Sequence, residues 1–181
     1  METIKRRPTR QIKLGNVLIG GGAPISVQSM LSVPTSDISA ALNQIHSLEK
    51  VGCEIIRFSV ETMSDIPYIY EFKRETKIPL VADIHFDYKL ALAALEAGVD
   101  GLRINPGNIG SRDKVEAVAK AAGEREVPIR IGVNSGSLPK ELLAKYGLSA
   151  EAMVEAALSH IRILEDLKFY AIKVSVKASQ V

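Results

Sequence analysis

Short apolar runs alternate along the chain with segments that carry apolar residues at spacings of three and four. The runs predict six β-strands, at residues 25–30, 55–60, 80–84, 101–105, 129–133 and 172–176. The segments between them predict helices at residues 37–51, 64–75, 88–97, 112–122 and 150–167, with a shorter helical piece at residues 140–146. The first four intervals between strand starts are about 20–30 residues, which suits βα units with short loops. The pattern therefore predicts a parallel α/β sheet.

The polar residues favour one of the two common parallel architectures. Five strands end in polar residues two apart, which share one face because side chains alternate along a strand. The sets are Arg57 and Ser59, Asp83 and His85, Arg103 and Asn105, Arg130 and Asn134 with Gly132 between them, and Lys173 with Ser175 and Lys177. A doubly wound sheet concentrates its site at one switch point, whereas candidates at nearly every strand end favour a TIM-type (β/α)8 barrel.

The predicted barrel is incomplete. Six strands and five helical crossovers fall short of eight, and such a barrel usually takes about 250 residues. We therefore expect the chain to be the leading part of a longer protein. Residues 11–22, with turn residues Gly15 and Asn16, predict a small hairpin that covers the barrel floor. The expected division is a tail and hairpin at residues 1–22 and a partial, substrate-binding barrel at residues 23–181.

Composition and charge exclude several classes of protein. A content of 46% apolar and 24% charged residues is ordinary for a globular domain, and a net charge of +2 does not argue for nucleic acid or a membrane as partner. The single Cys53 leaves no disulfide framework and no set of Cys ligands for a metal. No secretory signal or membrane span is predicted. We expect a reducing compartment, the cytoplasm or, in a plant or alga, the plastid.

The face that carries the polar sets is predicted to point into the barrel, and it is basic. Four of the five sets contribute an Arg or a Lys. Because the carboxyl ends of the strands form the mouth of such a barrel, these cations indicate an anionic, phosphorylated ligand. Alternatively, Arg57 forms a buried ion pair with a residue such as Asp83, and Lys173 and Lys177 form a solvated row on an edge strand.

The segment DIHFD at residues 83–87 places three ligand-type side chains on alternating positions. Such a trio could bind a divalent metal or supply acid/base groups. Alternatively, Asp83 orients His85 through a hydrogen bond and Asp87 caps the next helix. We favour capping for Asp87 and a site role for Asp83 and His85, because a buried polar pair without a function is costly.

Two strand ends lead into glycine-containing loops. The loop at residues 105–110 follows Arg103, and its backbone N–H groups could face an anion, although a plain βα turn is the alternative. Arg103 favours the anion. On the next strand Gly132 removes a side chain from the inward row, which could let a ligand approach the backbone.

Five motifs in a fixed order resemble one enzyme family. They are VQSM at residues 27–30, PLVADIHFDY at 79–88, LRINPGNIG at 102–110, IRIGVNSGSL at 129–138 and VSVKAS at 174–179. These strings resemble the N-terminal barrel of 4-hydroxy-3-methylbut-2-enyl diphosphate synthase, from about residue 12 to the last residue. The resemblance implies an oxidoreductase of the non-mevalonate isoprenoid pathway. Such an enzyme reductively opens 2-C-methyl-D-erythritol 2,4-cyclodiphosphate with two electrons that pass through a [4Fe-4S] cluster.

The resemblance also implies roles for individual residues. It maps diphosphate contacts onto Arg57, Arg103, Arg130 and Lys177, with Asn134 near the substrate. Further residues expected at the mouth are Gln28, Ser59, Asp83, His85, Asn105 and Lys173. No catalytic residue and no metal ligand is assigned within this chain.

The cluster is implied to lie in a second domain, absent from this chain, which holds it on three Cys and one Glu. That domain closes over the mouth of a partner subunit in a homodimer, and the electron donor is a flavodoxin or a ferredoxin. Because one Cys cannot ligate the cluster, we expect the isolated chain to be inactive. Two other functions stay open: a metal-dependent or acid/base barrel enzyme that handles pterins or phosphosugars, and a non-catalytic fragment that binds diphosphate.

Overall fold

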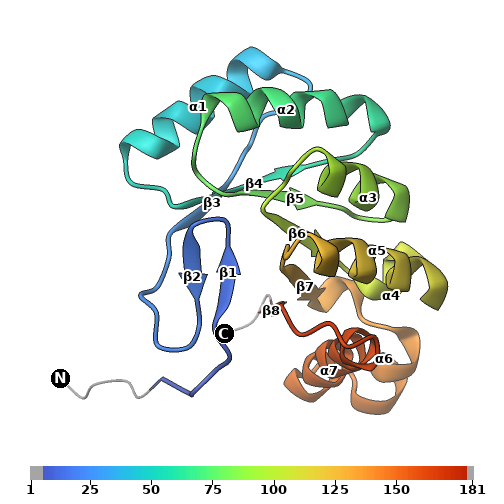
Figure 1. Ribbon diagram of the computed structural model, residues 1–181. Helices are drawn as coiled ribbons and strands as arrows, with labels where there is room; N and C mark the ends of the chain where they lie inside the picture. The colour runs from blue at the N-terminus through green and yellow to red at the C-terminus, as the bar shows by residue number, and fades with distance from the viewer. Residues whose placement is uncertain (1–5, 179–181) are drawn as a thin grey trace.

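A computed structural model describes residues 6–178, and its main feature is a curved parallel sheet of six strands with helices along its outer face (Figure 1). The strands are β3 (Gln28–Met30), β4 (Ile55–Ser59), β5 (Leu80–Asp83), β6 (Gly101–Ile104), β7 (Ile129–Asn134) and β8 (Ile172–Lys177). Each is hydrogen-bonded to the next along the chain, and β3 and β8 are the two ends of the sheet. This arrangement is an arc of a TIM-type barrel, which confirms the predicted fold class.

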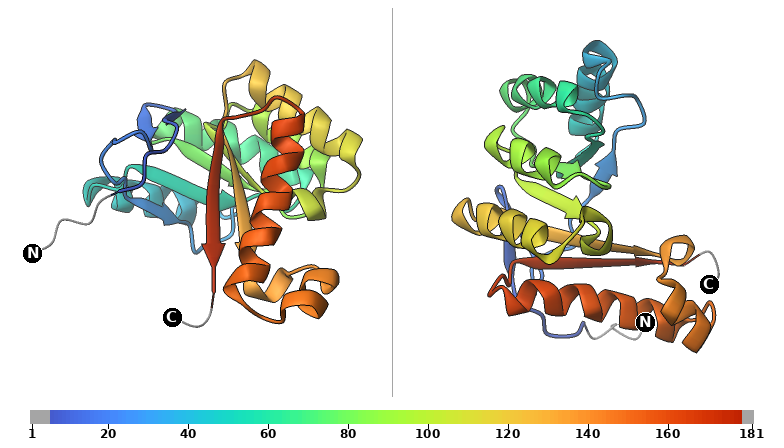
Figure 2. Two further views of the ribbon diagram at one scale, coloured as in Figure 1. Left: turned by 90° about the horizontal axis from the view of Figure 1, so that it is seen from below. Right: turned by 90° about the vertical axis from the view of Figure 1, so that its right-hand side faces the viewer.

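Every crossover between neighbouring strands contains a helix, as predicted. The helices are α1 (Ile38–Lys50), α2 (Ile66–Glu75), α3 (Tyr88–Glu96), α4 (Pro106–Ile109), α5 (Arg112–Glu124), α6 (Lys140–Tyr146) and α7 (Ala150–Asp166), with 3-10 turns η1 (Met63–Asp65) and η2 (Ser135–Ser137). Figure 2 shows α7 running alongside β8 in the outer layer. Asp37 and Asp87 cap α1 and α3: their carboxylates accept from the backbone N–H groups of Ala40 at 3.1 Å and Lys89 at 2.9 Å.

The structure corrects three of the predictions, besides shifts of one or two residues at other boundaries. The first strand starts at Gln28 instead of residue 25, because the ladder to β4 begins there; Ile25 is 82% exposed. Helix α5 continues through Gly123 to Glu124, and its end is closed by backbone bonds to the carbonyls of residues 122 and 123. The expected glycine loop after β6 contains the short helix α4, whose residues 108 and 109 donate to the carbonyl of Asn105.

A separate apolar cluster packs on each face of the sheet. The larger one fills the space between the outer face and the helices, where Phe58 of β4 meets Phe72 of α2 edge-to-face at a centroid distance of 5.4 Å. The smaller one lies on the inner face and consists of Leu14, Ile55 and Val81. The inner face is therefore apolar at the start of β4 and β5.

An antiparallel hairpin closes that end of the inner face. Its strands β1 (Ile12–Leu14) and β2 (Val17–Ile19) lie on the opposite side of the sheet from the helices (Figure 1). Leu14 is 3% exposed and packs against Ile55 and Val81. The hairpin thus covers the barrel floor and leaves the carboxyl ends of the strands open.

None of the helices in the described part of the chain is both long enough and apolar enough to cross a membrane.

Candidate functional site

The strand register lines up one polar residue from each of five neighbouring strands. The aligned residues run from β4 to β8 as Ser59, Asp83, Arg103, Arg130 and Lys173, each being the register partner of the next. They share the inner face, since the residues that alternate with them, such as Ile104 and Ile131, belong to the outer core. We call this set the inner polar row.

Asp83 is the anionic centre of the row. Its side chain is 1% exposed, and its carboxylate accepts from Arg57 through Nε at 3.0 Å and a terminal nitrogen at 2.6 Å. The other carboxylate oxygen accepts from Arg103 at 3.2 Å. The ion pair that was one alternative for Arg57 therefore exists, and Asp83 holds two guanidinium groups at once.

Two further cations of the inner face have neutral partners. Arg130 donates to the hydroxyl of Ser175 at 2.7 Å, and Lys173 donates to the amide oxygen of Gln28 at 3.2 Å. The second contact joins the first and last strands across the inside of the arc. Gln28, Arg130 and Lys173 also line one small pocket together with Leu14, so this part of the inner face lies directly above the hairpin.

Positive charge exceeds negative charge inside the arc. Among the described residues of β4 to β8, the inner face carries Arg57, Arg103, Arg130 and Lys173 but only the carboxylate of Asp83, which contacts Arg57 and Arg103. Burial, followed by the nearby Arg57 and Arg103, lowers the pKa of Arg130, and burial and then Arg130 lower the pKa of Lys173. Each cation therefore lacks part of its solvation and repels its neighbours. An anion would relieve both effects.

Arg130 also has an unused donor. Its Nε is buried and has no hydrogen-bond partner among the described residues. A buried N–H group without an acceptor costs free energy unless a ligand or water satisfies it.

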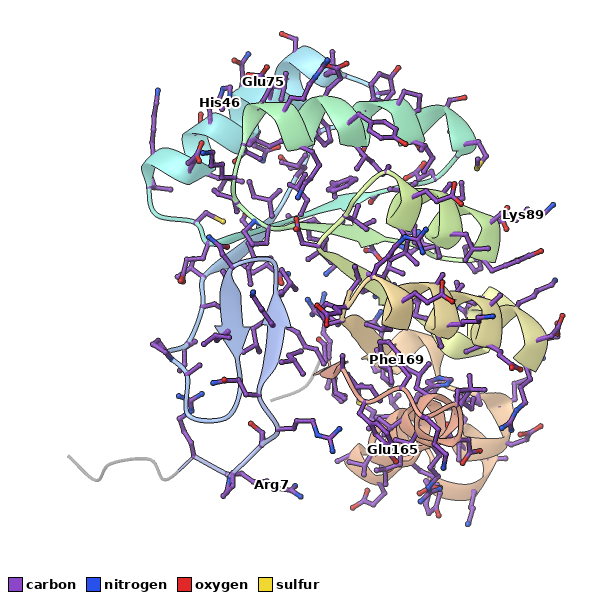
Figure 3. The ribbon with its side chains drawn as sticks, in the orientation of Figure 1. Arg7, His46, Glu75, Lys89, Glu165 and Phe169 are labelled. Carbon is purple, nitrogen blue, oxygen red and sulfur yellow. The ribbon has the colours of Figure 1, made fainter. Side chains whose placement is uncertain are left out.

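The remaining predicted residues lie at the carboxyl ends of the strands. Asn105 is buried at 7% exposure, Ser59 is half-buried, and Asn134 and Lys177 are exposed. His85 has a side chain that is 44% exposed, and its Nε2 lies 3.6 Å from an oxygen of Asp83. That distance is too long for the hydrogen bond we had considered. Side chains such as those of His46, Glu75 and Lys89, by contrast, come from the outer helix layer (Figure 3).

Sequence reasoning missed the role of Gly132. We had expected it to open the backbone to a ligand, but the guanidinium of Arg103 lies over it: a Cβ on residue 132 would be 2.5 Å from Nε of Arg103. The inward position of a glycine between two polar residues was visible in the sequence. Which neighbour would enter the space depends on the register, which the sequence does not display.

The family model described as the GcpE TIM-barrel domain matches residues 9–181. The chain belongs to the GcpE family. Two relatives are both called 4-hydroxy-3-methylbut-2-en-1-yl diphosphate synthase (flavodoxin). The one from Geobacter sulfurreducens is 61% identical over 96% of this chain and 49% of its own length. The one from Thermodesulfovibrio yellowstonii is 58% identical over 98% of this chain and 51% of its own length. The chain thus spans about half the length of the curated relatives it matches.

Solved structures support the barrel fold of this GcpE-family chain. Dihydropteroate synthase from Yersinia pestis superposes with a TM-score of 0.66 at 13% identity, covering 91% of this chain and 61% of that one. The enzyme from Xanthomonas albilineans gives a TM-score of 0.62 at 16% identity, covering 92% and 64%. At such low identity the likeness concerns the fold alone.

The described residues do not fit an iron–sulfur cluster in this GcpE-family chain. The only cysteine, Cys53, is buried on the floor side of the sheet, and its Sγ lies 3.2 Å from the carbonyl of Ile55. No group of three or more His, Cys, Asp or Glu side chains among the described residues is placed to hold a metal. The carboxylate of Asp83, which we had considered as a metal ligand, is occupied by two arginines.

Proposed function

We propose that this chain is the substrate-binding part of a 4-hydroxy-3-methylbut-2-enyl diphosphate synthase and that its inner polar row binds the diphosphate of 2-C-methyl-D-erythritol 2,4-cyclodiphosphate. The observation that carries the proposal is the excess of cations on the inner face, where Arg57, Arg103, Arg130 and Lys173 share the strands with the one carboxylate of Asp83. Membership of the GcpE family supports the identity of the substrate.

The chemistry of the site suits a diphosphate ligand better than a ligand that carries one carboxylate group. Guanidinium groups present planar forks of N–H donors that match phosphate oxygens, and Lys adds a compact charge. Arg57 and Arg103 keep donors beyond those that Asp83 takes, and Arg130 keeps its buried Nε. In the proposed reaction these groups hold the ring in place and stabilise the phosphate oxygen that leaves as the C–O bond breaks.

The exposed Asn134 and Lys177 are proposed to contact the substrate from the rim. They are register partners on β7 and β8, one step of the inward row above Gly132 and Ser175. A ligand that touches the deep guanidinium groups and these rim residues would span the depth of the mouth. His85, Ser59 and Asn105 are proposed to line the same opening.

The electrons of the proposed reaction would enter through a [4Fe-4S] cluster held by parts of the protein other than this chain. The names of the relatives point to a flavodoxin as the donor, in preference to a ferredoxin. A homodimer in which a second domain covers the mouth belongs to the same proposal.

Calorimetric titration of the 181-residue chain with the cyclodiphosphate tests binding. We expect Arg130→Ala to weaken the affinity about tenfold or more, because a charge-assisted hydrogen bond contributes about 1.5–3 kcal/mol. Arg162→Ala is the matched control, since Arg162 lies on the outer helix α7 in an exposed pair with Glu155. Equal losses in the two variants, or no binding by the wild type, would refute the binding role.

A chimera tests the reaction itself. This chain would replace the matching barrel segment of the Geobacter sulfurreducens relative, to which it is 61% identical. We expect the chimera to reduce the cyclodiphosphate with a flavodoxin donor and to lose activity with Arg130→Ala. A chimera that carries its cluster but is inactive with the wild-type barrel would contradict the assignment.

A further inference from the structure

The inward face of β7 contains a glycine that its backbone does not require. Gly132 lies in the middle of β7, and it is not among the glycines of the described chain that adopt a positive φ. Any residue could adopt this extended conformation, and glycine is unfavourable inside a strand because it loses more conformational freedom than alanine. The reason for glycine must therefore lie in the space next to it.

That space is filled by the side chain of Arg103. A Cβ on residue 132 would lie 2.5 Å from Nε, 2.6 Å from a terminal nitrogen and 2.9 Å from Cζ of Arg103. Real Cβ atoms essentially never approach heavy atoms below 3.0 Å, so the guanidinium would have to move. The contact is with the charged head of the side chain and not with a spare methylene, so any shift changes where the charge lies.

The neighbours of Arg103 leave its guanidinium few other positions to occupy. Arg130 is its register partner on one side, and their repulsion already contributes to the lowered pKa of Arg130. Asp83 is its register partner on the other side and is also bound to Arg57. A guanidinium pushed off Gly132 would move toward another cation or out toward solvent, and its 3.2 Å contact with Asp83 would be lost.

Gly101, the other strand glycine on the inner face, also leaves room for a neighbouring side chain, in this case an apolar one. A Cβ on Gly101 would lie 3.1 Å from a methyl group of Leu14, so this glycine admits the hairpin at the floor. Gly132 admits a cation at the level of the anion site. The two glycines thus make room for the apolar floor and for the charged layer above it.

We propose that Gly132 is a positioning residue: its missing side chain holds the guanidinium of Arg103 in the place where it binds an anionic diphosphate group. This inference rests on the proposed function of the inner polar row. It predicts that adding one methyl group at residue 132 weakens binding by acting through Arg103 and not by disturbing the fold.

The experiment is a double-mutant cycle on the 181-residue chain, with inorganic pyrophosphate as the probe in calorimetry. We expect Gly132→Ala to weaken the affinity about tenfold, as does the loss of one charge-assisted hydrogen bond. In an Arg103→Ala background the same change should have little effect, because the group it displaces is gone. Gly123→Ala on α5 is the matched control: its Cβ would meet only a ring carbon of Phe169, at an ordinary 3.8 Å.

A thermal unfolding midpoint separates positioning from simple damage. Alanine favours the strand more than glycine does, which offsets the lost contact of Arg103 with Asp83, and Asp83 keeps its two hydrogen bonds to Arg57. We therefore expect the midpoint of Gly132→Ala to stay close to that of the wild type while the affinity falls. If Arg103→Ala weakens binding but Gly132→Ala does not, or if the two losses simply add, the inference is wrong and the proposed function stands. If the wild-type chain does not bind pyrophosphate, both are wrong.

Discussion

Replacing Asp83 by Asn tests the central contact of the inner polar row. The substitution preserves shape and removes the charge that pairs with Arg57 and Arg103. Removing one partner of a buried ion pair typically costs about 3–5 kcal/mol. Asp83 is 1% exposed, but the side chains of Arg57 and Arg103 keep 21% and 11% of their exposure and can recruit water. We therefore expect a loss of about 3 kcal/mol, at the low end of that range.

Urea unfolding at low salt measures this loss, since urea, unlike guanidinium, does not screen charges. Asp166→Asn is the matched control, because its pair with Arg112 has side chains that are 59% and 63% exposed and should contribute about 0–1 kcal/mol. Saturating pyrophosphate should stabilise Asp83→Asn at least as much as the wild type, about 2.7 kcal/mol at a concentration of 100 times Kd, because the anion supplies the missing counter-charge. If Asp83→Asn unfolds at the same urea concentration as the control, the carboxylate does not hold the arginines and the reasoning fails.

Three further predictions concern the hairpin, the outer helix α7 and the inner face. Leu14→Ala should lower the free energy of unfolding by about 2–3 kcal/mol and expose hairpin amides to hydrogen exchange, because the side chain is 3% exposed and packs in the inner cluster. Unchanged protection would mean that the hairpin does not depend on this contact. Burial lowers the pKa of His160 below its ordinary 6.5, so the unfolded chain gains a proton more readily than the folded chain. The free energy of unfolding should therefore fall as the pH drops below about 6.5. In urea titrations His160→Leu should flatten that fall, and an equal slope in both proteins would exclude His160 as its cause. Ser175→Ala removes the acceptor of Arg130 and should weaken pyrophosphate binding about threefold to tenfold by calorimetry, whereas unchanged affinity would show that Arg130 does not need Ser175.

The elements of the fold could be predicted because each one has a local signal. The alternation of apolar runs with helical spacing located all six strands of the sheet, and capping chemistry identified Asp87 as the start of a helix. Where the local signal was ambiguous, the prediction was wrong. Gly123 is a typical helix-ending residue, yet backbone bonds one residue later close α5 instead.

For the candidate site, the direction of the side chains could be predicted, but most of their contacts could not. Strand alternation places Arg103 and Arg130 on one face, so their inward direction follows from the sequence. Their level inside the barrel depends on register, which comes from packing between strands far apart in sequence. For that reason the contact between Gln28 and Lys173 and the partner of Gly132 were not anticipated.

The register also shows why the inner face is suited to an anion. Arg103 and Arg130 are direct register partners, as are Arg130 and Lys173, and like charges on opposed strand positions are destabilising. Asp83 neutralises only one charge, while the contacts with Ser175 and Gln28 involve neutral groups. The chain thus keeps a repulsive row that its own side chains only partly compensate. A polyanion in the mouth would turn that repulsion into binding free energy, so the site should tighten around a diphosphate and loosen as added salt screens the cations.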